Sequence, residues 1–366
     1  MDFPTTIERI QARIKQIDPV SYAATRNYQN GKLTYLSPYI SRGVISTKQI
    51  FHNLKSNGYT WEQAEKLIQE LAWRDYWQLV WKNKGDDIFQ DLKQPQNPVS
   101  NHGIPQAIVD AKTDIFVIDD AIQSLYRDGY MHNHMRMYVA SICCNIVQSH
   151  WSHPSQWLYY NLLDGDLASN TLSWQWVAGS NANKKYYANQ DNINKYFDSH
   201  QKDTFLDVSY EEIDTLDIPS ILRETMNLNL TTSLPKIETL EIHDTKTLIY
   251  NYYNLDPFWY QDEDVQRILL LEPQFFEKYP VNDLCVDFIL NLSKNIPNLK
   301  IVVMPFADLL DFVKPEHIYF KEHPTNTHYT GHQEPRDWMT TLSDYYPSFF
   351  AYWKRAKKQL QAAWSN

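Results

Sequence analysis

The sequence predicts an α+β protein of two parts: an all-α domain over residues 1–200 and a smaller α/β domain over residues 245–366, joined by an acidic connector over residues 201–244. Three observations carry this prediction. Apolar residues recur with helical period in the first part, short apolar runs alternate with a helical pattern in the last part, and the charge balance changes between them. With 43% hydrophobic and 14% aromatic residues among 366, the chain can build a sizeable core.

The all-α domain is predicted from three long segments in which apolar residues stand three or four positions apart. These segments are ISTKQIFHNLKSNG, WEQAEKLIQELAWRDYWQLVWKN and VIDDAIQSLYRDGYMHNHMRMYVASICCNIVQSHW, with Asn and Gly residues between them. Ser46 and Thr47 stand directly before KQI, a pattern typical of a helix N-cap. We therefore expect a helix to begin there.

The α/β domain is predicted from short apolar runs that end in turn residues. The runs are TLIYNYY, RILLLEP, KIVVMPF and HIYFKEHP, and VNDLCVDFILNLSKNIPN lies between two of them with helical period. Strand–helix–strand spacing of this kind indicates a parallel, Rossmann-like sheet. A helix is expected at the carboxyl end of the chain.

The net charge of −10 is unevenly distributed. Residues 1–200 carry 19 Lys and Arg against 19 Asp and Glu, so the whole deficit lies in the remainder. Nucleic acid is therefore permitted as a partner of the first part, although bulk charge does not indicate it.

The compartment is predicted from what the sequence lacks. The first residues show no apolar signal-peptide core, and runs such as YVASICCNIV fall short of the roughly 20 residues that a membrane span needs. Three cysteines form neither a disulfide framework nor a four-cysteine cluster. We expect a cytoplasmic monomer with no membrane contact. No metal site is predicted, because the histidines lack a recognised ligand spacing.

Two carboxylates flank a glycine in LLDGDLASNTLSWQW, residues 162–176. A buried carboxylate needs a partner or loses its charge, and Arg136 of the segment GYMHNHMRM is a candidate partner for Asp164. Asn133 and Met137 share the helix face of Arg136. A purely structural ion pair is the alternative interpretation.

An aromatic face is predicted in QELAWRDYWQLVW, where Glu70, Trp73 and Trp77 recur at helical spacing. Such a face packs in a core, or it forms a cleft that stacks a planar group beside a carboxylate.

Hydroxyl groups cluster in GKLTYLSPYISRG, where Thr34 and Ser37 flank Leu36. The segment matches neither a P-loop nor the GxGxxG fingerprint. A phosphate contact and a capped helix start explain it equally well.

Four segments in order resemble the FAD-binding catalytic domain of the photolyase/cryptochrome family over roughly residues 20–180. They are TYLSPYISRGVIS, ELAWRDYW, GYMHNHMRM and LLDGDLASNTLSWQW. The resemblance implies a buried, folded FAD whose redox chemistry the protein tunes. The residues that it implies for binding FAD are Tyr22, Thr34, Leu36, Ser37, Asn133, Arg136, Asp164, Asp166 and Asn170.

The resemblance also implies individual roles at the flavin ring. Arg136 and Asp164 would form an ion pair beside the ring, Asp166 would accept a hydrogen bond from a ring N–H, and Asn170 would face N5. Trp174 and Trp151 would begin the tryptophan chain that photoreduces oxidised flavin.

The activity implied is light-driven repair of cyclobutane pyrimidine dimers in UV-damaged DNA, single- or double-stranded. Reduced FAD donates an electron to a flipped-out dimer, and aromatic stacking offsets the cost of flipping. The residues implied at the dimer are Glu70, Trp73, Asn133, Met137 and Trp176.

The sequence departs from the family pattern at several points. Leu33 stands where photolyases commonly have Thr, His134 where they have Arg, and residues 171–173 replace an Asn-Gly-Gly-like run. The third tryptophan of the chain has no counterpart in residues 85–112, and the usual N-terminal antenna domain is expected to be missing, with the α/β region as its rearranged replacement. An antenna chromophore is left open. A cryptochrome-like photoreceptor without repair activity is the alternative function, and a light-independent protein that kept only the fold is a third.

Overall fold

The computed structural model describes residues 2–236 and 241–365. Residues 237–240 of the predicted connector, and the end residues 1 and 366 of the two predicted domains, lie outside the described residues. The chain forms two compact units, each built from separate stretches of sequence. The first unit comprises 20–33 and 84–230, and the second comprises 2–19, 34–83 and the described residues from 231 onward. This division groups helices of the predicted all-α part with the sheet, so the predicted domain boundaries stay a prediction.

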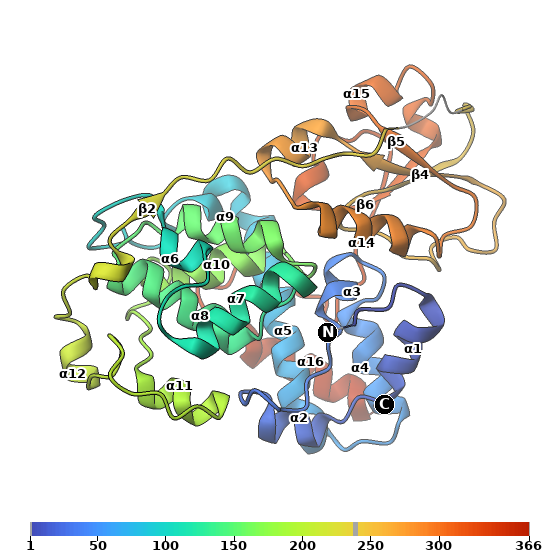
Figure 1. Ribbon diagram of the computed structural model, residues 1–366. Coiled ribbons are helices and arrows are strands. Elements are labelled where there is room, and N and C mark those ends of the chain that lie inside the picture. The colour runs from blue at the N-terminus through green and yellow to red at the C-terminus, as the bar shows by residue number, and fades with distance from the viewer. Residues whose placement is uncertain (1, 237–240, 366) are drawn as a thin grey trace. The chain divides into compact units, whose positions relative to one another are not determined.

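The regular structure of the first unit is mainly helical (Figure 1). A short antiparallel pair of strands, β1 (Ile104–Pro105) and β2 (Thr225–Met226), ties residues on either side of its main helices. The helices of this unit are α2 (Pro19–Thr25), α6 (Gln106–Val109), α7 (Phe116–Asp128), α8 (Asn133–Ser141), α9 (Ser152–Asn161), α10 (Leu167–Ala178), α11 (Gln190–Phe197) and α12 (Tyr210–Ile213).

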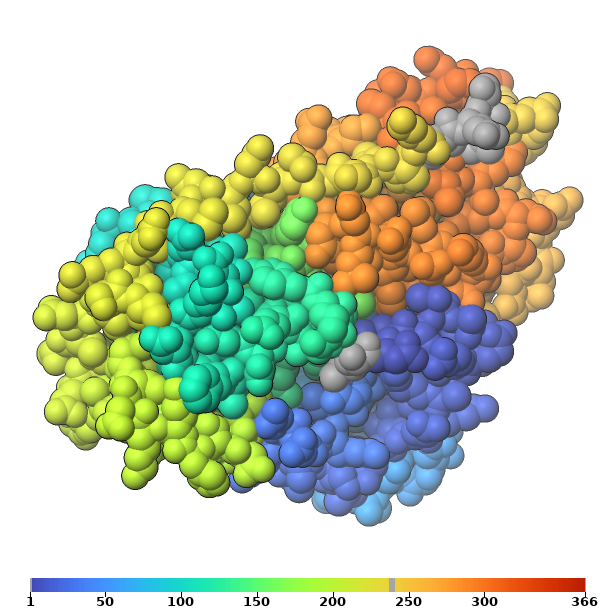
Figure 2. Space-filling view, viewed as in Figure 1, coloured from blue at the N-terminus to red at the C-terminus, as the bar shows by residue number. Residues whose placement is uncertain are grey.

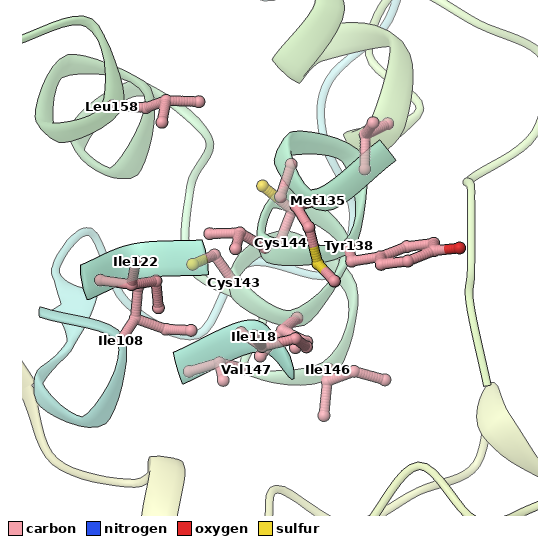
Figure 3. Close-up of a cluster of buried hydrophobic side chains, with 14 of the residues drawn as sticks. Ile108, Ile118, Ile122, Met135, Tyr138, Cys143, Cys144, Ile146, Val147 and Leu158 are labelled. Atoms are coloured by element: carbon pink, nitrogen blue, oxygen red, sulfur yellow. The ribbon is translucent and has the colours of Figure 1, made fainter. Parts of the chain in front are cut away.

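The core of the first unit lies where α7 and α8 pack together (Figure 3). Helix α8 continues into a π-helical turn, Ile142–Ile146, which buries both Cys143 and Cys144 among isoleucine and valine side chains. Burial raises the pKa of the Cys143 thiol, so it remains protonated at neutral pH. These cysteines are packing residues.

The segment around α11 covers one side of this core. Figure 2 shows residues 190–213 lying against α7 at the surface. The backbone N–H of Phe116 donates to Gln201 Oε1 at 3.0 Å, and Leu206 and Ile213 of this segment are buried. Residues 201–230 of the predicted connector therefore form part of the first unit.

The second unit contains a five-stranded parallel sheet with the order β5-β4-β3-β6-β7 (Figure 1). The strand order reverses at β3, from which β4 and β5 lie to one side and β6 and β7 to the other. The strands are β3 (Thr247–Tyr250), β4 (Gln266–Leu271), β5 (Leu299–Val303), β6 (Ile318–Lys321) and β7 (His332–Glu334). The helices of this unit are α1 (Ile7–Lys15), α3 (Ser37–Ser41), α4 (Thr47–Ser56), α5 (Trp61–Lys84), α13 (Pro273–Lys278), α14 (Asp283–Ser293), α15 (Phe306–Leu309) and α16 (Phe349–Ser365).

The elements predicted for this unit are confirmed. All four predicted strands are present, the predicted helix between two of them is α14, and α16 is the expected terminal helix. Helix α4 begins after Ser46, whose side chain accepts from the Gln49 N–H in a complete capping box. Strand β7 is not predicted from the sequence. It is an edge strand, and its residues His332, Gln333 and Glu334 are all polar.

In the described part of the chain, no helix is both long enough and apolar enough to cross a bilayer.

Candidate functional site

The loop between α9 and α10 is shaped by Gly165. A Cβ at this position would lie 3.0 Å from the Leu162 carbonyl oxygen and 3.1 Å from that of Tyr159, closer than side chains pack. The loop is also held by the Leu163 N–H, which donates to the Gly129 carbonyl at 2.9 Å. Glycine therefore lets the chain fold back tightly and turns the adjacent Asp164 and Asp166 into the interior.

Asp164 forms the ion pair predicted with Arg136 of α8. One guanidinium nitrogen, Nη2, lies 3.0 and 2.8 Å from the two carboxylate oxygens, and Arg136 Nε donates to the Met131 carbonyl at 2.8 Å. The Asp164 side chain is 4% exposed and that of Arg136 is 22% exposed. The pair is therefore largely removed from water, where each charge depends on the other.

Two histidines near this ion pair are held neutral. Burial, with the charges of His134 and Arg136, lowers the pKa of His132 to about 4, and burial also lowers the pKa of His134. His132 Nδ1 accepts from the His134 N–H at 3.1 Å. Of these three side chains, Arg136 therefore carries the positive charge at pH 7.

Asp166 occupies the N-cap of α10. Its carboxylate accepts from the Ser169 N–H at 2.7 Å, and the residue is 4% exposed. Beside it, the Ser169 hydroxyl is buried and has no hydrogen-bond partner within residues 2–236 and 241–365. An unpaired buried hydroxyl costs about 1–3 kcal/mol, so this turn of α10 calls for a further polar partner.

Replacing Asp166 separates its capping role from its predicted role toward a cofactor. Asp166→Ala should lower the free energy of unfolding of the flavin-free protein by about 1 kcal/mol, because the cap is lost. Asp166→Asn retains a capping oxygen and should leave that free energy within about 0.5 kcal/mol of wild type. Urea unfolding of both variants measures this, and equal losses in the two would contradict the capping role.

The other predicted residues of the first unit lie on the same elements. Asn133 is the exposed first residue of α8, and Met137 lies one turn further on, half-buried. The Asn170 amide donates to the Ser155 carbonyl at 2.8 Å, which fixes its orientation on α10. Tyr22 lies half-buried in α2. Their roles toward a cofactor stay predictions.

The predicted electron-transfer residues Trp174 and Trp151 are both buried, each 2% exposed. Trp151 Nε1 donates to Asp91 Oδ1 at 2.7 Å, and its backbone N–H donates to Gln96 Oε1 at 2.9 Å. Asp91 escaped prediction, because nothing in the sequence between the two residues connects an acid with an indole 60 positions away. The carboxylate stands where it could accept the indole proton if Trp151 were oxidised.

Trp176 is an exposed indole, in contrast with its neighbours on α10. It is 37% exposed, and its ring lies tilted against Tyr186 with centroids 5.8 Å apart. An accessible indole of this kind can stack on a planar group.

The second unit holds the remaining predicted residues. Ser37 begins α3, and Leu36 before it is 1% exposed. The helix start expected as an alternative for this segment is present, but its N-cap residue Leu36 makes no side-chain capping bond. Glu70 forms an ion pair with Lys66 at 2.8 Å. Thr34 is half-buried. A phosphate contact at Thr34 and Ser37 stays a prediction.

Trp73 is stacked on another ring of its own unit. Its centroid lies 3.7 Å from that of Phe349 at the start of α16, with 10° between the ring planes. One face of this indole, predicted to stack on a damaged base, is therefore covered by Phe349. The core-packing alternative for this face of α5 is present in the structure.

Known proteins match the helical part of the chain. The family model described as the FAD binding domain of DNA photolyase matches residues 67–208. A deoxyribodipyrimidine photo-lyase of Streptomyces griseus is 30% identical over 146 residues, which are 40% of this chain and 32% of that protein. A cryptochrome DASH of Danio rerio is 30% identical over 171 residues, which are 43% of this chain and 32% of that protein. A solved cryptochrome of Synechocystis sp. PCC6803 aligns with a TM-score of 0.49 at 24% identity, over 54% of this chain and 44% of that one.

The helices between residues 67 and 208, which hold the buried arginine–aspartate pair, are similar to the FAD binding domain of DNA photolyase. The matched part of the chain spans about a third of the length of the two curated relatives.

The residues of the first unit fit FAD chemically. A flavin ring offers N–H donors and carbonyl acceptors, and the set contains the Asp166 carboxylate, the Asn170 amide and the Arg136 guanidinium. The buried Ser169 hydroxyl, which has no partner in the described part of the chain, adds an unused polar group next to Asp166. FAD is the cofactor of this domain family.

Proposed function

We propose that this protein is a light-dependent DNA-repair enzyme that splits cyclobutane pyrimidine dimers in UV-damaged DNA. The observation that carries the proposal is the buried ion pair of Arg136 and Asp164, which lies beside the capping carboxylate Asp166 within the residues matched to the photolyase domain. The proposal includes a monomer acting in the cytoplasm. FAD, when bound and reduced, would supply the electron that opens the dimer.

In this proposal the chain positions the cofactor and holds charge near it. The Arg136 guanidinium would offset a negative charge on the reduced ring, and Asp164 would hold that guanidinium in place. Asp166 would accept from a ring N–H, with Asn170 oriented by its bond to the Ser155 carbonyl. Tyr22, Thr34, Leu36, Ser37 and Asn133 would complete the cofactor contacts.

In the same proposal, exposed and half-buried side chains bind the pyrimidine dimer. Trp176 would stack on the flipped-out dimer and Met137 would contact it, with Trp73 and Glu70 contributing the second indole and a carboxylate. Trp174 and Trp151 would pass electrons to oxidised flavin, and Asp91 would accept the indole proton of Trp151.

A blue-light repair assay tests the proposal. Reduced, flavin-loaded protein is given thymine-dimer oligonucleotides, single- and double-stranded, with a dark control, and restored thymine is measured. Trp176→Ala should lower affinity for the damaged strand about five- to a hundredfold, because stacking on the base is lost, while flavin content is retained. Phe116→Ala, which removes a 69% exposed ring elsewhere in the same unit, is the matched control and should bind as wild type.

The alternative function is a cryptochrome-like photoreceptor without repair activity. The covered face of Trp73 favours it, because Phe349 stacks on one face of an indole that is predicted to stack on the substrate. Light-induced reduction of the bound flavin without thymine restoration on either strand form would overturn the repair proposal in favour of this alternative.

A further inference from the structure

A second candidate binding site lies in the second unit, at the carboxyl ends of β6 and β7. It is an open hollow of about 730 Å³, here called the β6–β7 hollow, within the range of small-molecule sites. The last residues of the two strands, Lys321 and Glu334, lie on one side of it, and the residues 256–260 that follow β3 lie on another. Open parallel sheets bind ligands beyond the carboxyl ends of their strands, near the point where the strand order reverses.

The charged groups in the hollow are held in fixed positions. The Glu334 carboxylate accepts from Trp259 Nε1 at 2.9 Å and from the Tyr260 hydroxyl at 2.8 Å. Lys321 Nζ lies 2.7 Å from Asp256 Oδ2, and both side chains are less than one-fifth exposed. The hollow therefore offers a preformed arrangement of hydrogen-bonding groups between aromatic rings.

Two indoles of the hollow already carry a cation over their rings. Lys321 Nζ lies 5.5 Å from the ring centroid of Trp259, and the Arg336 guanidinium lies 4.5 Å from that of Trp338. A planar electron-rich ring is attracted to these cations. Asp256, Glu334 and Asp337 also line the hollow, so its acidic and basic side chains balance in number.

The mouth of the hollow contains an exposed ring and an exposed cation. Phe258 is 41% exposed although it is a large apolar side chain. Lys48 Nζ lies 3.1 Å from Asp337 Oδ1, with the two side chains 45% and 40% exposed. Exposed pairs of this kind are held weakly, so a ligand anion can compete for the Lys48 ammonium.

We infer that the β6–β7 hollow binds a nucleoside phosphate, with its base against Phe258 and Trp338 and its phosphate near Lys48. The segment that follows β3, residues 251–265, contains no glycine, so it has no glycine-rich phosphate loop. Side chains, and not a loop of backbone N–H groups, provide the contacts to the phosphate. This ligand is separate from the FAD and from the DNA of the proposed function.

Titration calorimetry on the full-length, flavin-loaded protein tests the inference with AMP, adenosine and inorganic phosphate as probes. Because FAD occupies its own site, AMP should bind saturably with one equivalent and leave the flavin content unchanged. Adenosine should bind about tenfold more weakly, because the charge-assisted contact to Lys48 is absent. No saturable AMP binding, or AMP that only displaces flavin, would overturn the inference.

Matched variants locate the binding. Phe258→Ala should weaken AMP binding about five- to a hundredfold, whereas Phe312→Ala, which removes a 47% exposed ring outside the hollow, should leave it unchanged. Lys48→Gln should weaken binding of AMP but not of adenosine. Equal affinities for AMP in Phe258→Ala and Phe312→Ala would place the nucleotide elsewhere and contradict the inference.

Discussion

Arg136→Ala is expected to lower the free energy of unfolding by about 3–5 kcal/mol, because it removes the guanidinium that pairs with the buried Asp164 carboxylate. That carboxylate is 4% exposed and takes both of its contacts to Arg136 from one guanidinium nitrogen. The loss exceeds that of a surface ion pair, since water cannot replace the missing cation. Urea unfolding followed by tryptophan fluorescence measures it, and flavin content should fall in parallel if the pair lies beside the cofactor.

Two controls separate charge burial from lost packing. Arg136→Met combined with Asp164→Asn removes both charges, so the double variant should be more stable than Arg136→Ala. Arg9→Ala removes an arginine whose ion pair with Asp2 is exposed, with side-chain exposures of 63% and 71%, and it should leave stability unchanged. A double variant as unstable as Arg136→Ala would contradict an unpaired charge as the cause.

Asp75→Asn is expected to raise the free energy of unfolding by up to about 3 kcal/mol at pH 8 and to leave it nearly unchanged at pH 4. Burial raises the pKa of Asp75 to about 6, although its carboxylate accepts from the Thr47 hydroxyl at 2.9 Å and from the Met339 N–H at 3.2 Å. Asparagine can accept from Met339 and donate to Thr47, so the contacts remain while the buried charge disappears.

The pH dependence follows from the direction of this pKa shift. Between the ordinary aspartate pKa and about 6, the folded state binds more protons at Asp75 than the unfolded state does. The contribution of Asp75 is therefore fully present below pH 4 and is lost as the pH rises through 6. Urea unfolding of wild type and Asp75→Asn at several pH values should show the two curves diverging over this window. The exposed control Asp262→Asn should run parallel to wild type, and a parallel Asp75→Asn curve would contradict the raised pKa.

Local patterns predicted most individual elements of both units. The buried runs of β3 and β4 are nearly continuous in apolar residues, as strands covered on both faces must be, and Ser46 carries its capping signal within four residues. The pairing of Arg136 with Asp164 followed from chemistry, because two charges in apolar surroundings satisfy each other best.

Contacts between distant parts of the sequence could not be predicted. Periodicity describes one helix at a time, so it gives no sign that α5 packs with α16. The Trp73–Phe349 stack and the Trp151–Asp91 hydrogen bond join residues that no local signal relates. The polar sequence of β7 likewise carries no strand pattern, because its neighbour β6 and not its own composition fixes it in the sheet.

The discontinuous second unit has a consequence for synthesis on the ribosome. Helix α5 emerges with Trp73 and its neighbouring aromatic rings long before their stacking partner, because Phe349 follows about 280 residues later. At a synthesis rate of about 5–20 residues per second, roughly 15–60 s pass between the synthesis of this aromatic face and that of its partner on α16. The segment 84–230 completes the first unit during that interval. The nascent chain then contains one complete unit and one incomplete unit whose aromatic face lacks its packing partner. Chaperone capture of nascent chains should therefore be strongest after α5 has emerged and should end once α16 has been released.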